Sequence, residues 1–449
     1  MKFAVALCLL LCAIGVMTIS LPGAVEEEQK SRAEREKEKE QPDNNFGAEK
    51  RSDVAEFKRG DDEMEFKRAS EEECEATITK WTDDTVYYAY CSAAMKNKYS
   101  LEAFAQVSSI LDGILTFKDV TKDDYDCTNN ADREHYIAVV DNGKSEGCWS
   151  YVGMLSGEKQ TLNLQTGKCT SVYVIIHEIF HALGLLHTQQ RPDSPQYITV
   201  NTQNIKDGKE GNFAMKESMC TTCKYQTCSL MHYGRTFFSK GGETITPLDP
   251  DMGPDQGKQN QVQAGDLCAI YLLYDAREKE TCKEVDGDGN DYCLWGTGNA
   301  YNFKCCRCPD HFTGDNCGTF DENAVSDNSG EKHEVTQGGA PVTVTSPNNA
   351  AGSSYLPSTK KTYFISAPTN CNVQMSADFI SVENDASCYW DQLRYWSGES
   401  ILDCPETICG EYTDVTYTSK SNFFMLEFNS DDMYNEKGFI MSFEAVNCT

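Results

Sequence analysis

Three histidines and one glutamate fall within eleven consecutive residues, in the pattern His-Glu-x-x-His-x-x-Gly-x-x-His. His177 and His181 are four residues apart, so on an α-helix their imidazoles share one face and can reach a single ion. Gly184 can adopt the left-handed conformation that ends a helix, which would bring His187 to the same ion. Three imidazoles leave one tetrahedral position for water, and Glu178 is placed to act as a base. The pattern predicts a catalytic zinc site.

The stretch that carries these residues has the composition of a buried helix. Residues 172–176 are apolar, and apolar positions continue at Ile179 and Leu183. Thr170 or Ser171 can serve as the N-terminal cap. The chain has only seven histidines, and three of them share this window at ligand spacing, which favours a metal site over ordinary core histidines.

The pattern resembles that of the metzincins, in which a methionine turn follows the histidines. Residues 229–233, with the sequence Ser-Leu-Met-His-Tyr, supply such a turn. The sequences at 191–193 and 197–201 narrow the resemblance to the astacin family of zinc endopeptidases. This resemblance implies that Met231 lies beneath the metal and that Tyr233 stabilises the oxyanion of the reaction.

Composition indicates an exported protein. The chain has 449 residues and a formal net charge of -30, which argues against nucleic acid as a partner because phosphates would repel such a surface. A basic start and an apolar run before Ala24 predict a signal peptide over residues 1–22, and no other stretch is apolar enough to span a membrane. Loss of Cys8 and Cys12 with this leader leaves an even number of cysteines, which predicts disulfides and a secreted, extracellular protein.

Residues 23–68 are expected to form a propeptide. The segment is dense in charged residues and poor in apolar ones, as in chains that do not fold alone. Three dibasic pairs are candidate processing sites: 50–51, 58–59 and 67–68. Astacin zymogens carry a short Phe-x-Gly-Asp element whose aspartate occupies the open zinc position. Residues 57–61 resemble it with one additional residue, so Asp61 is the candidate zymogen switch.

The catalytic domain is assigned to residues 69–281, with the α+β fold of the metzincins. A strand over 81–90, a helix over 101–115 and a strand over 136–140 precede the histidine helix. Residues 160–164 alternate in polarity and predict an edge strand. In the astacin family an extended substrate pairs with such a strand, so the resemblance implies that the substrate backbone adds to this edge.

One position departs from the astacin pattern. The family usually has a glutamate directly after the third histidine, where it receives the amino terminus of the mature enzyme, and this chain has Thr188. Without that carboxylate, a longer mature N-terminus beginning near Ala69 is expected. Activation would then require only removal of the inhibitory segment.

The resemblance also implies two disulfides in the catalytic domain. One joins Cys148 to Cys169. The other runs from Cys127 to the end of the domain, where Cys268 and Cys282 are alternative partners.

Residues 282–317 form a small cysteine-dense block. The block is too short to build an apolar core of its own, so disulfides would hold it. Its last cysteines, Cys306, Cys308 and Cys317, stand at spacings that resemble an EGF-like module.

Residues 318–449 contain short alternating strands separated by Asn, Gly, Ser and Pro, which predicts a β-sandwich. The segment resembles a CUB domain, and this resemblance implies disulfide-forming roles for Cys388 and Cys409. Some CUB domains bind calcium through one glutamate and two aspartates. The matching residues of this chain are Glu383, Asp391 and Asp431, with solvated acidic loops as the alternative.

These predictions combine into a secreted zinc endopeptidase made as a zymogen, with one Zn²⁺ per subunit and calcium as a candidate ligand of the last domain. Protein substrates follow from the activity, and the EGF-like and CUB domains would bind matrix or cuticle proteins. One alternative is an adhesion or scaffold protein with a silent catalytic domain. Another is a zinc hydrolase that does not act on peptides. The complete ligand set disfavours the first, and the strand suited to an extended peptide disfavours the second.

Overall fold

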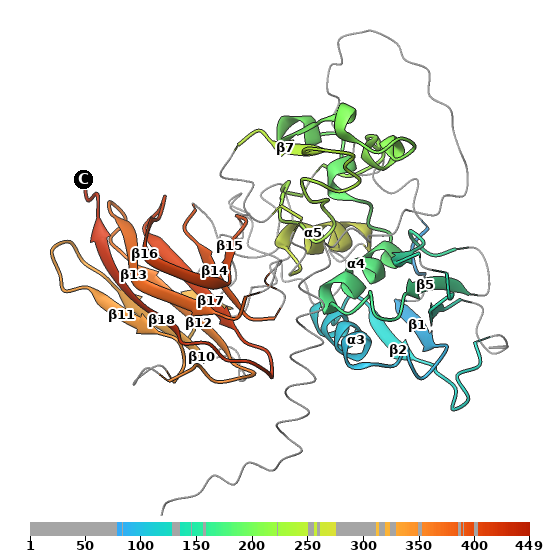
Figure 1. Cartoon of the computed structure of the whole chain (residues 1–449), viewed down its shortest axis with the longest axis horizontal. Helices are drawn as coiled ribbons and strands as arrows, with labels where there is room; N and C mark the ends of the chain where they lie inside the picture. Colours follow the sequence, from blue (N-terminus) through green and yellow to red (C-terminus); the bar gives the residue numbers. More distant parts are fainter. Residues whose placement is uncertain are drawn as a thin grey trace, which may run out of the picture. The chain divides into compact units, whose positions relative to one another are not determined.

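The computed structural model of the chain resolves a catalytic domain and a β-sandwich domain (Figure 1). The described residues are 79–82, 84–127, 135–144, 146–155, 159–221, 223–249, 256–257, 261–274, 311–313, 319–323, 329–348, 353–384, 388, 390–398 and 403–449. The expected signal peptide, the expected propeptide with Asp61, and nearly all of the cysteine-dense block lie outside them. Within these ranges, no helix combines the length and the apolar character needed to cross a membrane.

The catalytic domain is built on a five-stranded sheet in the order β2-β1-β3-β5-β4. Its strands are β1 (Thr85–Tyr90), β2 (Thr116–Asp119), β3 (Ile137–Val140), β4 (Cys148–Ser150) and β5 (Gln160–Leu164). Every pairing is parallel except that of β4 with β5, which is antiparallel. The expectation of an edge strand over residues 160–164 is therefore wrong. β5 lies between β3 and β4 and is buried at four of its five positions, and β4 forms the edge.

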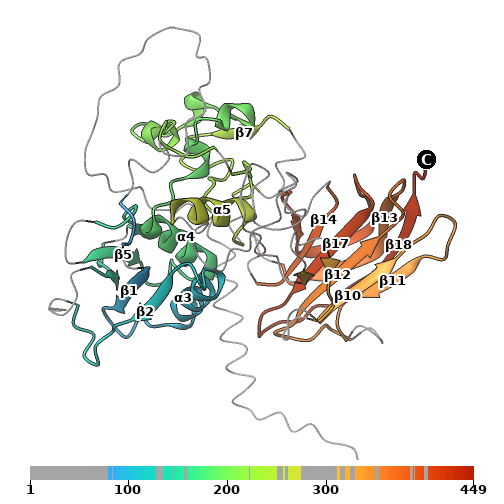
Figure 2. The same ribbon diagram turned by 180° about the vertical axis from the view of Figure 1, so that it is seen from behind.

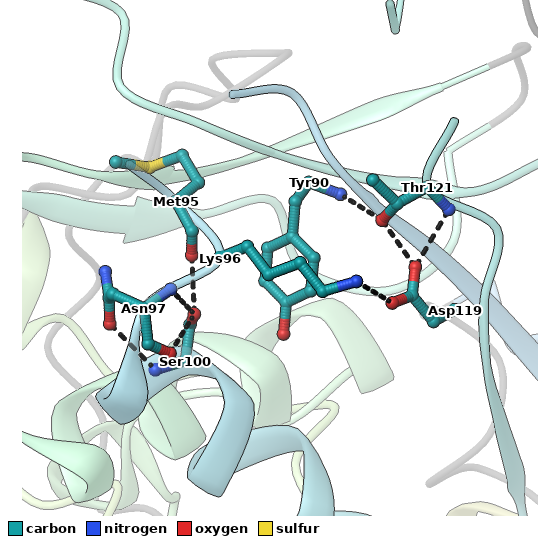
Figure 3. A network of polar contacts seen from close by, with 7 residues as sticks. All are labelled: Tyr90, Met95, Lys96, Asn97, Ser100, Asp119 and Thr121. Atoms are coloured by element: carbon teal, nitrogen blue, oxygen red, sulfur yellow. Dashed lines mark hydrogen bonds and ion pairs between the residues drawn. The ribbon is translucent and has the colours of Figure 1, made fainter. Parts of the chain in front are cut away.

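Helix α3 (Lys98–Ile110) begins where Asn97 caps it (Figure 3). The Asn97 side chain accepts hydrogen bonds from the backbone N–H groups of Tyr99 and Ser100, which satisfies donors that a helix start leaves unpaired. The Ser100 hydroxyl accepts from the Asn97 N–H and donates to the carbonyl of Met95. These contacts start the helix three residues earlier than the apolar pattern from Leu101 indicates.

A polar bridge ties the loop before α3 to the sheet. The Lys96 ammonium lies 3.1 Å from the Asp119 carboxylate at the end of β2, and 5.5 Å from the centre of the Tyr90 ring (Figure 3). The Thr121 backbone N–H donates to Asp119, and the Thr121 hydroxyl accepts from the Tyr90 N–H at 3.0 Å. Because these contacts join β1, β2 and the start of α3, they fix how the helix approaches the sheet.

Helix α4 (Val172–Leu183) carries the first two histidines. It begins after Ser171 and ends at Gly184, whose φ of +116° is the left-handed conformation that favours glycine. Ten of its twelve residues are buried, because α4 packs against β4 and β5 of the sheet and against α3. The two helices lie next to each other beside the sheet (Figures 1 and 2). Their apolar side chains share one core with Val86, Tyr90 and Val139 of the sheet.

The second half of the catalytic domain is mostly irregular. It contains four short 3₁₀ helices, two paired strands and one helix: η2 (Thr188–Gln190), η3 (Ser194–Gln196), η4 (Thr202–Asn204), η5 (Glu210–Phe213), β6 (Ile198–Val200), β7 (Ile245–Pro247) and α5 (Ala264–Leu273). α5 belongs to the same apolar core as α4 through its residues Ile270 and Leu273. This packing places α5 behind the methionine turn.

The last domain is a β-sandwich of two sheets, as expected for a CUB domain. One sheet has the order β10-β12-β17-β14-β15, with strands β10 (Ser329–Glu334), β12 (Lys360–Ser366), β17 (Phe423–Asn429), β14 (Gln392–Trp396) and β15 (Glu406–Ile408). The other has the order β11-β18-β13-β16, with strands β11 (Val342–Thr345), β18 (Gly438–Val446), β13 (Asn372–Val382) and β16 (Gly410–Thr418).

Alternating side chains of both sheets form the core of the sandwich. In β13, Val373, Met375 and Ala377 are buried, and a bulge after Ala377 shifts the pattern before Ile380. A short hairpin of β8 (Phe312–Thr313) and β9 (Thr319–Phe320) contributes aromatic rings to a second cluster on the first sheet.

The disulfides confirm some expected pairings and correct another. Cys148 is bonded to Cys169, as expected. Cys388 and Cys409, both expected to form disulfides, are bonded to each other. The pairing of Cys127 with Cys268 or Cys282 is wrong: Cys127 is bonded to Cys91.

The corrected bond follows from strand pairing. Cys91 directly follows β1, and its N–H donates to Val139 of the neighbouring β3. The Cys127 carbonyl accepts from the Tyr136 hydroxyl just before β3, so both cysteines lie beside the same strand. Cys268, on α5, is instead bonded to Cys223, and both are buried in the core of the catalytic domain.

Candidate metal centre

Three buried imidazoles converge at the end of α4. His177 and His181 project from the helix, and the turn at Gly184 returns the chain so that His187 joins them. One ring nitrogen from each histidine lies within 4.8 Å of the others, and the Nε2 atoms of His181 and His187 are 3.1 Å apart. Zinc–nitrogen bonds of about 2.0–2.1 Å in a tetrahedron place two ligands about 3.3 Å apart. The spacing therefore fits a zinc ion.

Carbonyl groups orient two of the three rings. The Nδ1 atom of His177 lies 2.8 Å from the Leu230 carbonyl, and that of His181 lies 2.7 Å from the Leu185 carbonyl. A carbonyl can only accept, so each Nδ1 carries the proton and each Nε2 offers a free lone pair. The rings are thereby fixed in the tautomer that binds a metal through Nε2.

The centre keeps its histidines neutral. Burial lowers the pKa of His177 well below its usual value, and the neighbouring His181 lowers it further. Burial also lowers the pKa of His187, followed by the effects of His181 and His177. Because a metal binds the deprotonated imidazole, these shifts prepare the ligands at neutral pH.

Glu178 lies next to the first ligand and is 2% exposed. Burial raises the pKa of its carboxyl to about 8, against a hydrogen bond from the Ser150 backbone N–H of β4 that lowers it. Its Oε2 atom has no hydrogen-bond partner among the residues that the structure describes. A buried carboxylate oxygen without a partner is costly, and a water held by a cation would satisfy it. Two observations therefore support a metal with a bound water at this site: the three imidazole donors and the Oε2 atom of Glu178.

The methionine turn, residues 229–233, supports the centre from the opposite side. The Leu230 carbonyl orients His177, and Met231 is buried in the core of the catalytic domain. The Met231 carbonyl accepts from the Thr188 N–H at 2.9 Å, directly after the third histidine. The turn therefore contacts the chain on both sides of the ligand set.

Asp266 of α5 fixes this turn, and sequence reasoning missed it. Its carboxylate accepts from the Leu230 N–H at 3.0 Å and from the Ser229 hydroxyl at 2.5 Å. Burial raises the pKa of Asp266, and these hydrogen bonds oppose the shift. A lone carboxylate at the start of an otherwise apolar helix is the signal that could have identified it.

Thr188 lies in the same network. Its hydroxyl is 2.7 Å from that of Ser229, which in turn donates to Asp266. Most astacins carry a glutamate at this position. In this chain the Thr188 hydroxyl instead forms a hydrogen bond with the hydroxyl group of Ser229.

Tyr233 lies beside the third ligand. Its ring centre is 4.4 Å from that of His187, and the side chain is fully buried. Its backbone N–H donates to the side chain of Gln189, and its carbonyl accepts from the His232 ring and from Gln256. The backbone of Tyr233 is therefore held on both sides, and its ring packs against aromatic neighbours that include Phe213 and Phe237.

The acidic residues singled out in the last domain also come together. Carboxylate oxygens of Glu383, Asp391 and Asp431 lie within 4.8 Å of one another. The Tyr355 hydroxyl donates to Asp391 and accepts from the Glu383 N–H at 3.0 Å. Burial raises the pKa of Asp391 to about 7, and the charges of Asp431 and Glu383 add to this rise. Such a cluster of oxygens fits a calcium ion.

A helix that presents two histidines beside an antiparallel edge strand, with a third histidine after a glycine turn, defines a metzincin catalytic domain. Residues 73–275 match the family model of the astacin peptidases, and residues 337–443 match that of the CUB domain. The chain therefore contains an astacin peptidase domain followed by a CUB domain.

Similar proteins come from several animal groups. Blastula protease 10 of Paracentrotus lividus is 30% identical over 68% of this chain and 49% of its own length. Zinc metalloproteinase nas-32 of Caenorhabditis elegans is 37% identical over 38% of this chain and 25% of its own length. The chain spans about half the length of the first curated relatives it matches. The solved structure of high choriolytic enzyme 1, a hatching enzyme zinc-protease of Oryzias latipes, is 27% identical, covers 44% of this chain and 94% of its own, and has a TM-score of 0.36.

Proposed function

We propose that the protein is a secreted zinc-dependent endopeptidase. The observation that carries the proposal is the buried convergence of His177, His181 and His187 beside Glu178, whose Oε2 atom accepts no hydrogen bond from the described residues. When bound there, zinc supplies a Lewis acid that polarises the peptide carbonyl and makes a water acidic enough to ionise near neutral pH.

Two residues of the chain carry out the other steps of the reaction, proton transfer and stabilisation of the oxyanion. Glu178 takes a proton from the attacking water and then delivers it to the leaving amine. A cation nearby lowers the pKa of this buried carboxyl, which lets it act as a base. The Tyr233 hydroxyl donates a hydrogen bond to the oxyanion that forms at the scissile carbonyl.

The edge strand β4 binds the substrate backbone. Its outer side is not paired within the described sheet, and it contacts α4 next to the ligands. An extended peptide that adds to this edge has its backbone fixed beside Glu178, whose carboxylate accepts from Ser150 of the same strand. This geometry supports a peptide substrate over a small ester or amide.

The proposal also covers where the protein acts, how it is activated and what its other domains bind. The several disulfides of the described chain support an extracellular location. Residues 23–68 would keep the enzyme inactive through Asp61, and the mature chain would start near Ala69. The EGF-like block over 282–317 and the CUB domain, with calcium at Glu383, Asp391 and Asp431, would bind matrix or cuticle proteins.

The variant Glu178→Ala tests the catalytic assignment. General base catalysis contributes about 10²–10⁴ in rate, so hydrolysis of casein by the processed protein should fall by that factor while one zinc per chain remains. Metal content measured by atomic absorption is the control for an intact site. Full activity of the zinc-loaded variant would falsify the assignment of Glu178. A zinc-free but active wild type would contradict the whole proposal.

A further inference from the structure

One disulfide bond joins the catalytic domain to the CUB domain. Cys228 directly precedes the methionine turn, and Cys404, which lies between β14 and β15, is 176 residues further along the chain. The Cys228 N–H also points to the Sγ atom of Cys404 at 3.3 Å. Lys224 forms an ion pair with Asp403, the residue before Cys404. The exposed ion pair adds little, so the covalent bond is the dominant link.

This bond lies close in sequence to the group that orients a zinc ligand. Ser229 follows Cys228 and donates to the buried carboxylate of Asp266. Leu230 comes next, and its carbonyl holds the Nδ1 atom of His177 at 2.8 Å. Only one residue, Ser229, therefore separates Cys228 from the carbonyl on which the tautomer and ring direction of His177 depend.

A second disulfide restrains the other end of the same segment. Cys223 is bonded to Cys268 on α5, and the Arg191 guanidinium donates to the Cys223 carbonyl at 2.8 Å. Residues 223–228 are thus cross-linked at both ends, to α5 at one end and to the CUB domain at the other. The segment before the methionine turn, residues 223–228, can therefore move little as long as both disulfide bonds are intact.

We propose that Cys228 and Cys404 are positioning residues of the catalytic centre, and that the CUB domain is a covalent support of the methionine turn. The inference rests on the proposed peptidase function. Groups that orient metal-ligating histidines typically change activity or metal affinity by about 10- to 100-fold when they are lost. Release of Cys228 lets residues 228–230 move and loosens the carbonyl that holds His177.

The first test compares two double variants of the full-length, processed protein. C228A/C404A removes the bond between the domains, and C371A/C448A removes a disulfide of similar solvent exposure that lies within the CUB domain. The substrate is a short fluorogenic peptide, which needs no binding surface on the CUB domain. We expect kcat to fall about tenfold in C228A/C404A with KM within about twofold, and zinc to dissociate faster into a chelator. The C371A/C448A variant should match the wild type in all three.

The outcomes separate this inference from the proposal on which it rests. A wild type without peptidase activity contradicts the proposed function. An active wild type and a folded C228A/C404A variant with unchanged kcat and unchanged zinc release contradict the positioning role.

A second experiment remains informative if C228A/C404A does not fold. A site for a specific protease is inserted after Glu280, between the matched domains, in the otherwise unchanged chain. After cleavage, the two domains should stay joined on a non-reducing gel and separate on a reducing one. Peptidase activity of the cleaved protein should persist until mild reduction separates the domains, and then fall about tenfold. Separation of the domains without reductant would overturn the inference.

Discussion

The histidine cluster of the catalytic domain is buried, and so are Glu383 and Asp391 of the acidic cluster of the CUB domain, but the two kinds of ligand respond to burial in different ways. Burial lowers the pKa of His177 and His187, so these ligands are neutral and ready for a metal at physiological pH. Burial raises the pKa of Asp391 to about 7, so this ligand resists the charged form that a metal requires. The histidine site is therefore formed in advance, whereas the acidic site depends on its ion to become fully charged.

The comparison also separates the tasks of the two sites. Neutral ligands leave the full charge of a zinc ion available to substrate and water, which suits catalysis. Carboxylates neutralise most of the charge of a calcium ion, which suits a structural role. Zinc loss should thus stop catalysis and leave the CUB domain folded, and calcium loss should lower the stability of the CUB domain and leave zinc bound.

Removal of a zinc ligand gives the largest expected effect. His181→Ala leaves two donors, so we expect less than stoichiometric zinc and no detectable hydrolysis, with unchanged calcium binding. Metal analysis and a casein digest measure both. His333→Ala, which changes a partly exposed histidine of β10, is the matched control and should behave as the wild type. Measurable peptidase activity of a zinc-free His181→Ala variant would contradict the assignment of catalysis to the zinc site.

Removal of the Tyr233 hydroxyl should give the next largest effect. Loss of one oxyanion donor typically costs about 10²–10³ in kcat, so Tyr233→Phe should lower kcat by about that factor with unchanged zinc content. Steady-state kinetics on a peptide substrate give kcat and KM separately. Tyr88→Phe, a ring change in β1 on the α3 side of the core, is the control. A change in KM alone would assign Tyr233 to substrate binding instead.

Calcium should stabilise the CUB domain without altering catalysis. At a hundredfold excess over its dissociation constant, a ligand adds about 2.7 kcal/mol to the free energy of unfolding. We expect calcium to raise the melting temperature of the full chain, and Asp391→Asn to abolish that rise. Asp378→Asn changes an exposed acid of the same domain and should leave it intact. An equal calcium response in both variants would show that Asp391 is not a ligand.

The smallest effect is a pH dependence of the calcium-free CUB domain. Asp391 has a folded pKa of about 7 and an unfolded pKa near 4, so the folded state binds the extra proton between these values. Its contribution to stability is therefore greatest at low pH, is lost as pH rises toward about 7, and is constant above that. Melting curves in a calcium chelator at pH 5 and pH 7.5 measure it, with Asp391→Asn as reference. A steeper fall in the variant than in the wild type would contradict the assigned sign.

Local features of the chain were predictable from sequence. The four-residue spacing of the histidines and the glycine after the helix are local signals, and the structure places all three imidazoles together. The three acids of the CUB domain were identified through family resemblance, and their side chains also meet. His177 and His181 lie on a helix that the local pattern indicates, whereas the three acids lie in loops next to β13, β14 and β17.

Pairings between distant elements were not predictable in the same way. The position of β5 inside the sheet depends on which strands pair, and alternation of side chains does not specify that order. Cys91 and Cys127 become neighbours only once β1 lies beside β3. The role of Asp266 was also hidden, because its partners are backbone groups of the methionine turn, 36 residues away.

The edge strand β4 has only three residues, Cys148–Ser150. A longer open edge would be a template for pairing with other copies of the chain, and it would hold both halves of a cut peptide tightly. Three residues allow only a short ladder, which forms with a substrate and dissolves once the bond is cleaved. If β4 binds the substrate as proposed, we expect the brevity of this strand to limit both self-association and inhibition by cleaved products.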